Sequence, residues 1–159
     1  MKLQSYLMGE WREGQGEGVP VRDASTGEVL ARVTAEGLPV KEAVAWGREV
    51  GGRALLALGF QERGRRLRAL AQYLSERKEA LYRLYATTGV TRRDARCDVD
   101  GGIGVLYTYS SLARNLPEGN LLPEDDFLPP PKDLSFQGSH VIAPTGGITV
   151  QINAFNFPA

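Results

Sequence analysis

The sequence predicts an α/β fold in which a domain of alternating strands and helices begins near the end of the chain. Three observations predict it. Short strand-like segments separated by Gly-rich turns fill the first third, helical periodicity fills the middle, and strand-like segments return after residue 134. The last of these, Ile148–Ile152, leads into a polar loop with Pro158, a residue that suits the first turn of a helix. We therefore expect the first half of a βαβ unit, without its helix.

Composition and charge are those of an ordinary soluble protein. The 159 residues include 19 basic and 19 acidic side chains, and 42% of the residues are apolar. Balanced charge argues against nucleic-acid or anionic-membrane partners. There is one cysteine, no signal peptide, and no apolar run near the roughly 20 residues that span a bilayer. We expect a cytoplasmic location and no disulfide.

Residues 1–36 are expected to form an N-terminal β-hairpin region. It contains three strand-like segments, Tyr6–Trp11, Val19–Val21 and Val29–Thr34. The turn before the last segment contains Asp23, Ser25 and Gly27, which supply side-chain-to-backbone hydrogen bonds and a positive φ.

Residues 37–115 are expected to form a helical segment. Its predicted helices are Val40–Leu58, Gln61–Thr88, which a second start near Ser75 could divide, and Thr91–Asn115. Thr91 is the predicted N-cap of the last helix, with Asp94 near the positive end of its dipole. The arginines of Arg63–Arg68 are flanked by acidic residues, and we interpret them as a solvated helix face and not as a phosphate-binding patch.

Two patterns within this segment indicate packing and not a cofactor site. An apolar stripe follows helical spacing and is typical of a core face; it comprises Leu67, Leu70, Ala71, Leu74, Leu81, Leu84 and Tyr85. Gly101, Gly102 and Gly104 lack a preceding strand and the G-x-G-x-x-G spacing of a phosphate loop. We interpret them as sites of close helix packing.

Residues 116–134 are expected to be a Pro-rich connector, because prolines exclude regular helix and central strand. Residues 135–159 should then contain a strand of the oligomerisation type, Ser135–Ile142, a turn over Pro144–Gly147, and the strand Ile148–Ile152.

Few side chains outside the tail are candidates for chemistry. His140 is the only histidine and Cys97 the only cysteine, which excludes a metal site of the usual Cys/His kind. Cys97 lies in mid-helix between Arg96 and Asp98, whose effects on its thiol oppose one another, so we interpret it as structural or incidental. His140 is interpreted as solvated or packed. The carboxylates of Glu124, Asp125 and Asp126 are interpreted as a solvated turn.

The tail is different, because ligands bind at the carboxyl ends of strands in open α/β sheets. Asn153 and Asn156 flank Phe155 on such a loop. An Asn amide is a neutral donor that can stabilise a developing oxyanion. The alternative is that these asparagines only shape a turn.

The segment Gly147–Pro158 resembles the strand that aldehyde dehydrogenases follow with Pro-Trp-Asn-Phe-Pro. Asn156, Phe157 and Pro158 match, whereas Ala154 and Phe155 replace Pro-Trp. This variant is similar to one subgroup, the aldehyde dehydrogenase domain of the bifunctional ring-opening enzyme of phenylacetate catabolism. Further segments resemble that subgroup: Leu7–Trp11, Ala35–Leu38, Thr88–Arg92, Asp100–Gly104, Tyr107–Tyr109 and Leu121–Asp125.

The resemblance implies the N-terminal fragment of an aldehyde dehydrogenase fold: β-hairpin, helical segment, and the start of the Rossmann-like cofactor domain. It implies NAD- or NADP-dependent oxidation of an aldehyde to an acid through a cysteine thiohemiacetal and a thioester. Asn156 would be the side-chain donor of the oxyanion hole. Ile152, Asn153, Ala154 and Phe155 would line the cofactor. The subgroup's substrate is an open-chain CoA-thioester semialdehyde, and a homo-oligomer is expected.

In this family the catalytic Cys, the general-base Glu and the Gly-rich cofactor loop lie downstream of the Asn-Phe-Pro motif, and this sequence does not contain them. We therefore expect the 159 residues alone to be inactive and to bind neither NAD nor NADP. The alternative function is that of a truncated, non-catalytic chain acting as a structural or oligomerisation piece through unpaired strand edges.

Overall fold

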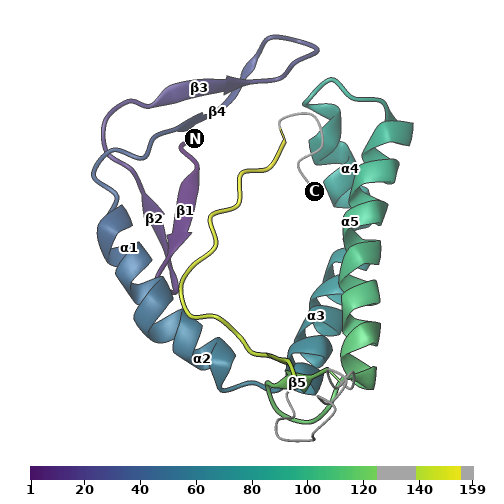
Figure 1. The fold of residues 1–159 in the computed structure, drawn as a ribbon. Helices are drawn as coiled ribbons and strands as arrows, with labels where there is room; N and C mark the ends of the chain where they lie inside the picture. Colours follow the sequence, from purple (N-terminus) through teal and green to yellow (C-terminus); the bar gives the residue numbers. More distant parts are fainter. Residues whose placement is uncertain (125–138, 155–159) are drawn as a thin grey trace, which may run out of the picture.

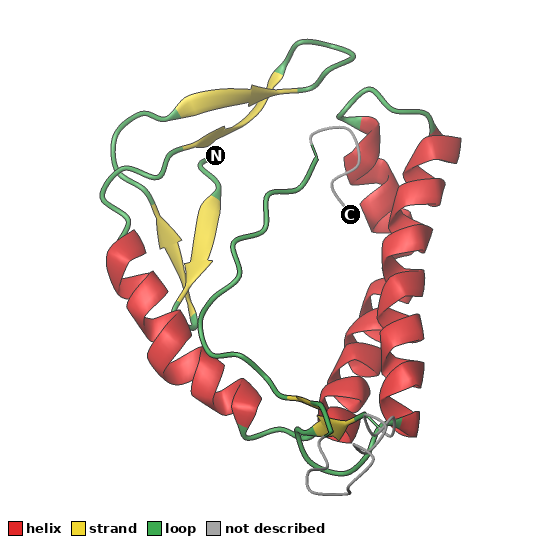
Figure 2. Ribbon diagram, viewed as in Figure 1, coloured by secondary structure: helices red, strands yellow, loops and turns green. Residues whose placement is uncertain are grey.

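The computed structural model describes residues 1–124 and 139–154. Its elements form an open frame (Figure 1). On one side, residues 1–58, here the N-terminal arm, carry two hairpins and a helical run; on the other, residues 59–115, here the helical unit, carry three longer helices (Figure 2). An extended segment, residues 143–154, crosses the space between them. In the described ranges, no helix has the length and apolar character needed to cross a bilayer.

The first hairpin pairs β1 (Gln4–Leu7) with β2 (Glu10–Glu13) in antiparallel register. The prediction of one strand over Tyr6–Trp11 was wrong, because the chain reverses at Met8 and Gly9. Both residues have positive φ, 55° and 92°, as the tight turns of two-residue hairpins require. Met at the first position of such a turn carries no sequence signal for it, so the reversal was missed.

The second hairpin pairs β3 (Val19–Arg22) with β4 (Val29–Val33). The predicted turn is confirmed: the carboxylate of Asp23 accepts hydrogen bonds from the backbone N–H groups of Ser25 (2.8 Å) and Thr26 (3.0 Å), and Gly27 has φ 76°. A bridge between Lys2 and Arg32 joins the two hairpins. The region is therefore a pair of hairpins and not a single one.

A continuous helical run follows the hairpins, close to the predicted Val40–Leu58. It comprises α1 (Val40–Trp46), the π-helical turn η1 (Gly47–Gly51) and α2 (Gly52–Leu56). The glycines that weaken an α-helix here coincide with the π turn. None of the residues of this run is buried.

The helical unit contains α3 (Phe60–Ser75), α4 (Lys78–Ala86), α5 (Arg92–Leu112) and the 3₁₀ turn η2 (Ala113–Asn115). The predicted N-cap of α5 is confirmed: the Thr91 hydroxyl accepts a hydrogen bond from the Asp94 N–H at 3.2 Å. The start near Ser75 was wrong by two residues. Ser75 is the last residue of α3, and Arg77 occupies the N-cap position of α4 without a side-chain cap.

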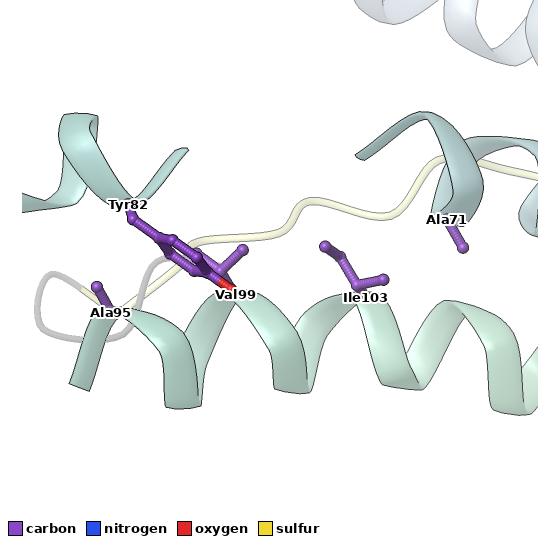
Figure 3. Close-up of a cluster of buried hydrophobic side chains, with 5 residues drawn as sticks. All are labelled: Ala71, Tyr82, Ala95, Val99 and Ile103. Carbon is purple, nitrogen blue, oxygen red and sulfur yellow. The ribbon is translucent and has the colours of Figure 1, made fainter. Parts of the chain in front are cut away.

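The core lies where α3 and α4 pack on α5 (Figure 3). Ala95, Val99 and Ile103 recur every four residues along one face of α5 and meet Ala71 of α3 and Tyr82 of α4. Part of the predicted stripe joins this cluster, namely Ala71, Leu74, Leu81 and Tyr85. For Leu70 and Leu84 the core prediction was wrong, because their side chains are exposed.

Close helix packing occurs at a different glycine from those predicted. A Cβ added at Gly64 of α3 would lie 2.5 Å from the Ala113 Cβ and 3.2 Å from the Ser110 carbonyl oxygen. Gly101 and Gly104 have no described atom within 4 Å of such a Cβ, so close packing is wrong for these two. They lie on the exposed side of α5.

Two junctions join the arm to the helical unit. At one end, the Asn120 side chain donates to the Leu56 carbonyl, and its oxygen accepts from Arg63 at 2.8 Å. At the other end, the Ala24 N–H donates to the Thr87 carbonyl at 2.8 Å. Each junction has only a few hydrogen bonds, so the arm and the helical unit are joined at their two ends.

The chain after the connector is extended. A short antiparallel pair joins β5 (Leu122–Pro123) to β6 (Val141–Ile142). The predicted strand Ile148–Ile152 is not formed within the described residues, and its Val150 and Ile152 side chains are 77% and 90% exposed. A strand needs a hydrogen-bonded neighbour, and no described strand pairs with this segment.

Candidate functional site

The predicted site lies at the end of the extended segment. Ile152, Asn153 and Ala154 are exposed there, in extended backbone without regular structure. Phe155 and Asn156, the remaining predicted cofactor residue and the predicted oxyanion donor, lie outside the described residues. The described part of the site is therefore a short extended segment with exposed side chains. Further polypeptide or a ligand could contact these side chains.

His140 and Glu124 form a pair that joins two strands. The His140 Nδ1 atom lies 3.2 Å from the Glu124 carboxylate, and the Glu124 N–H donates to the His140 carbonyl at 2.9 Å. Both side chains are exposed. This arrangement fits the predicted solvated histidine and supports the β5–β6 pair. Asp125 and Asp126 lie outside the described residues.

The rest of the described chain offers no group of metal ligands and one free cysteine. Within residues 1–124 and 139–154, no group of three His, Cys, Asp or Glu side chains could hold a metal ion. Cys97 is exposed on α5 and lies outside the buried cluster, so a packing role is excluded and an incidental role remains.

A polar cluster joins α4 to α5. The Asp100 carboxylate accepts a hydrogen bond from the Tyr82 hydroxyl at 2.7 Å and pairs with the Lys78 ammonium at 2.8 Å. These contacts lower the pKa of Asp100, and they raise the pKa of both Lys78 and Tyr82. These pKa shifts follow from contacts that link α4 to α5, and they do not indicate a catalytic group.

Three arginines share a groove that the sequence pattern did not indicate. Arg65 and Arg66 pair with Glu62 at 2.6 and 3.1 Å, as the predicted solvated face requires. Arg63 instead turns toward the groove between α2 and the extended segment, where Arg48 and Arg53 also lie. Only the path of residues 144–149 creates this groove, so helical periodicity alone could not have identified it.

Comparison with known proteins bears on the family and the fold. The model of the aldehyde dehydrogenase family matches residues 11–159. The chain belongs to the aldehyde dehydrogenase family. It is also 40% identical, over 160 residues, to a 3,4-dehydroadipyl-CoA semialdehyde dehydrogenase of Aromatoleum evansii; the match covers 100% of this chain and 31% of that relative.

Solved aldehyde dehydrogenase structures share the fold. A point mutant of Staphylococcus aureus betaine aldehyde dehydrogenase in complex with NAD⁺ matches 77% of this chain and 28% of its own, with a TM-score of 0.63 and 22% identity. A double mutant of the same enzyme matches 78% of this chain and 28% of its own, with a TM-score of 0.63 and 22% identity. The predicted family and its mixed α/β fold are confirmed, and this chain spans less than a third of each relative.

Proposed function

We propose that this chain is the N-terminal part of an NAD- or NADP-dependent aldehyde dehydrogenase that oxidises a CoA-linked semialdehyde to the acid. The observation that carries the proposal is the match of the family model to residues 11–159, together with 40% identity to a CoA-semialdehyde dehydrogenase along the whole chain. The subgroup motif Asn153–Pro158 supports the same substrate class. An aldehyde is the small-molecule partner in this proposal.

Asn156 is the proposed donor to the reacting oxygen. As a nucleophile adds to an aldehyde, negative charge develops on its oxygen, and a neutral amide N–H stabilises that charge without competing as a base. The nucleophilic Cys and the general-base Glu of the family would come from polypeptide beyond this sequence.

The described residues before Asn156 fit a cofactor wall. Ile152 and Ala154 are exposed, so a ligand can reach them, and the small Ala154 leaves room beside the backbone. Bound NAD or NADP would accept the hydride of the aldehyde. We propose that Ile152, Asn153, Ala154 and Phe155 help to position the ring that receives it. The 159 residues alone lack the family's phosphate-binding loop, and we propose that they retain no tight NAD(P) site.

A hybrid enzyme tests the proposal. Residues 1–159 would replace the matching part of the Aromatoleum evansii relative, and the rate of reduced-cofactor formation from a CoA semialdehyde would be measured. We expect activity, and we expect Asn156→Ala to lower kcat by about 10²–10³. Asn153→Ala is the matched control and should act mainly on the KM of the cofactor. A hybrid that folds but loses nothing on Asn156→Ala would refute the role of Asn156.

A second candidate is a non-catalytic, oligomerising chain. The exposed apolar side chains of the extended segment favour it, since Val150 and Ile152 are 77% and 90% exposed and no described strand pairs with their segment. Sedimentation of the purified chain over a range of concentrations tests it. A monomer at every concentration would contradict this candidate and leave the dehydrogenase proposal intact.

A further inference from the structure

A basic groove runs between the first helical run and the extended segment. One wall is η1 with α2, the other is residues 144–149, and Arg63 at the start of α3 closes one end. Figure 1 shows the extended segment passing alongside these helices. The groove has a volume of about 530 Å³, which falls within the roughly 300–1,000 Å³ of small-molecule sites.

The charges that line the groove are all positive. Arg48, Arg53 and Arg63 line it, and no acidic side chain does so among the described residues. Arg53 is partly neutralised, because it pairs with Glu49 at 2.6 Å. For Arg48 and Arg63, no described carboxylate lies within ion-pair distance. Two cationic groups therefore line the groove with no counter-charge among the described residues.

Arg63 is held in position by neutral acceptors. Its guanidinium donates to the Leu58 carbonyl at 3.0 Å and to the Asn120 side-chain oxygen at 2.8 Å, and the side chain is partly buried. Neutral acceptors fix the orientation of the group and leave its charge available. A fixed guanidinium loses little entropy when it binds an anion, and it presents a fork that matches a phosphate.

Glycines bring backbone to the surface of the groove. A Cβ at Gly47 would meet the Ile148 side chain at 3.4 Å, and one at Gly52 would lie 3.8 Å from the Gly147 carbonyl oxygen. A larger side chain at Gly47 or Gly52 would therefore fill the space between the two walls. At these two glycines the helix and the extended segment therefore lie close together, and the groove opens beside this contact.

We propose that this groove binds a nucleotide carrying more than one phosphate group, with Arg48 and Arg63 as phosphate ligands. Two unneutralised guanidinium groups match a ligand with at least two anionic centres, and the volume suits a nucleoside with its phosphates. The inference deepens the proposed function and rests on it, since a CoA-linked aldehyde carries such a nucleotide. A polymeric nucleic acid is disfavoured by the balance of 19 basic and 19 acidic residues.

Calorimetric titration of the 159-residue chain with adenosine 3′,5′-bisphosphate tests the inference. We expect binding that weakens as salt is raised, because exposed charges are screened, and no binding of adenosine. Arg48→Gln should weaken the affinity roughly tenfold, the typical loss of a charge-assisted hydrogen bond. Arg66→Gln is the matched control, an exposed arginine of α3 outside the groove that pairs with Glu62, and it should leave the affinity unchanged.

Further ligands identify the source of the phosphates. If coenzyme A binds more tightly than dephospho-CoA and NAD⁺, the groove is assigned to the CoA nucleotide. If NAD⁺ binds as tightly as coenzyme A, the groove is assigned to the dinucleotide. Arg48→Lys, which keeps the charge and loses the fork, should give an intermediate loss. Circular dichroism verifies that each variant keeps its helices.

Three results would overturn the inference: no heat with the bisphosphate at millimolar concentration, equal losses in Arg48→Gln and Arg66→Gln, or equal binding of adenosine and its bisphosphate. These outcomes are independent of the dehydrogenase assay. An active hybrid with no nucleotide binding to this chain rejects the groove alone. Nucleotide binding with an inactive hybrid rejects the proposed activity alone.

Discussion

The N-terminal arm and the helical unit are similar in length but differ in how they are held together. Buried apolar side chains lie almost entirely in the helical unit, where α5 packs on α3 and α4. In the arm, Ala31 is the one buried apolar residue, and the helical run from Val40 to Leu56 buries none. The helical unit therefore has a core of its own, whereas the arm depends on strand pairing and two junctions.

The surface area expresses the same difference. The chain exposes 12072 Å², whereas a compact protein of 17.3 kDa exposes about 7,800 Å². In the arm, large apolar side chains that are exposed include Trp11, Val50 and Leu55. Helices with an exposed apolar side commonly pack against further polypeptide. The helical unit, which has the buried core, should therefore be the more stable of the two parts.

Removing a core side chain should produce the largest effect. Ile103 is 5% exposed and packs in the cluster between α3, α4 and α5. Ile103→Ala deletes buried methyl groups and leaves a cavity, so the free energy of unfolding should fall by about 2–5 kcal/mol. Val105→Ala, two residues along the same helix at a side chain that is 54% exposed, should change it by less than about 0.5 kcal/mol. Urea denaturation followed by circular dichroism measures both, and equal losses would contradict a core at this face.

Two glycines of the helical unit should respond in opposite directions to alanine. In Gly64→Ala the new Cβ would meet the Ala113 Cβ at 2.5 Å, so α3 and α5 must separate, at a cost of about 1–3 kcal/mol. In Gly101→Ala the Cβ meets no described atom within 4 Å, and helix propensity should stabilise the protein by up to about 1 kcal/mol. Thermal unfolding of the two variants gives the sign of each. A Gly64→Ala protein at least as stable as the parent would show that the α3–α5 interface is not closely packed.

Features that depend on local chemistry were predictable from the sequence. The Asp23 turn and the Thr91 cap follow from side chains that bond to backbone two or three residues away. Part of the apolar stripe was also predictable, because Ala71, Leu74, Leu81 and Tyr85 share helical spacing. Leu70 and Leu84 share the same spacing, and periodicity cannot report which flank of a stripe meets another helix.

Features that depend on distant parts of the chain were not predictable. Nothing in the local sequence distinguishes Gly64 from other helix glycines. Only the path of α5 shows that α3 makes a close contact with the following helix at Gly64. The groove arginines are brought together by residues 144–149, about ninety residues further along the chain than Arg53. For the site itself, the sequence carried the Asn-Phe-Pro motif, while Asn156 lies outside the described residues. Its role stays a prediction.

Loss of a helix cap should have an intermediate effect. The Thr91 hydroxyl accepts the Asp94 N–H at 3.2 Å and donates to the Asp94 carboxylate at 2.7 Å. Thr91→Ala leaves that N–H without a protein partner at the start of α5, so stability should fall by about 1 kcal/mol. Thr91→Ser keeps the hydroxyl and should restore most of the loss. Chemical denaturation of the three proteins measures the difference, and an unchanged Thr91→Ala variant would show that the cap contributes nothing.

The smallest effect should come from the polar tie between α4 and α5, and it should appear as a dependence on pH. The pKa of Asp100 is lowered by Lys78 and Tyr82, so its contribution is present above its ordinary value of 3.8 and is lost as the pH falls through the lowered pKa. The pKa values of Lys78 and Tyr82 are raised, chiefly by Asp100, above their ordinary 10.5 and 10.0. Their contribution is present below these values and is lost as the pH rises through the raised ones.

Asp100→Asn should therefore make the profile of unfolding free energy against pH shallower on both its acid and its alkaline limbs. Glu62 is the matched control, because Arg65 and Arg66 lower its pKa but no group of the α4–α5 tie contacts it. Glu62→Gln should alter the acid limb alone. If the two variants have the same alkaline limb, Asp100 does not stabilise the contact between α4 and α5. The Tyr85–Asp98 and Glu79–Arg92 contacts and the apolar core would then hold the two helices together.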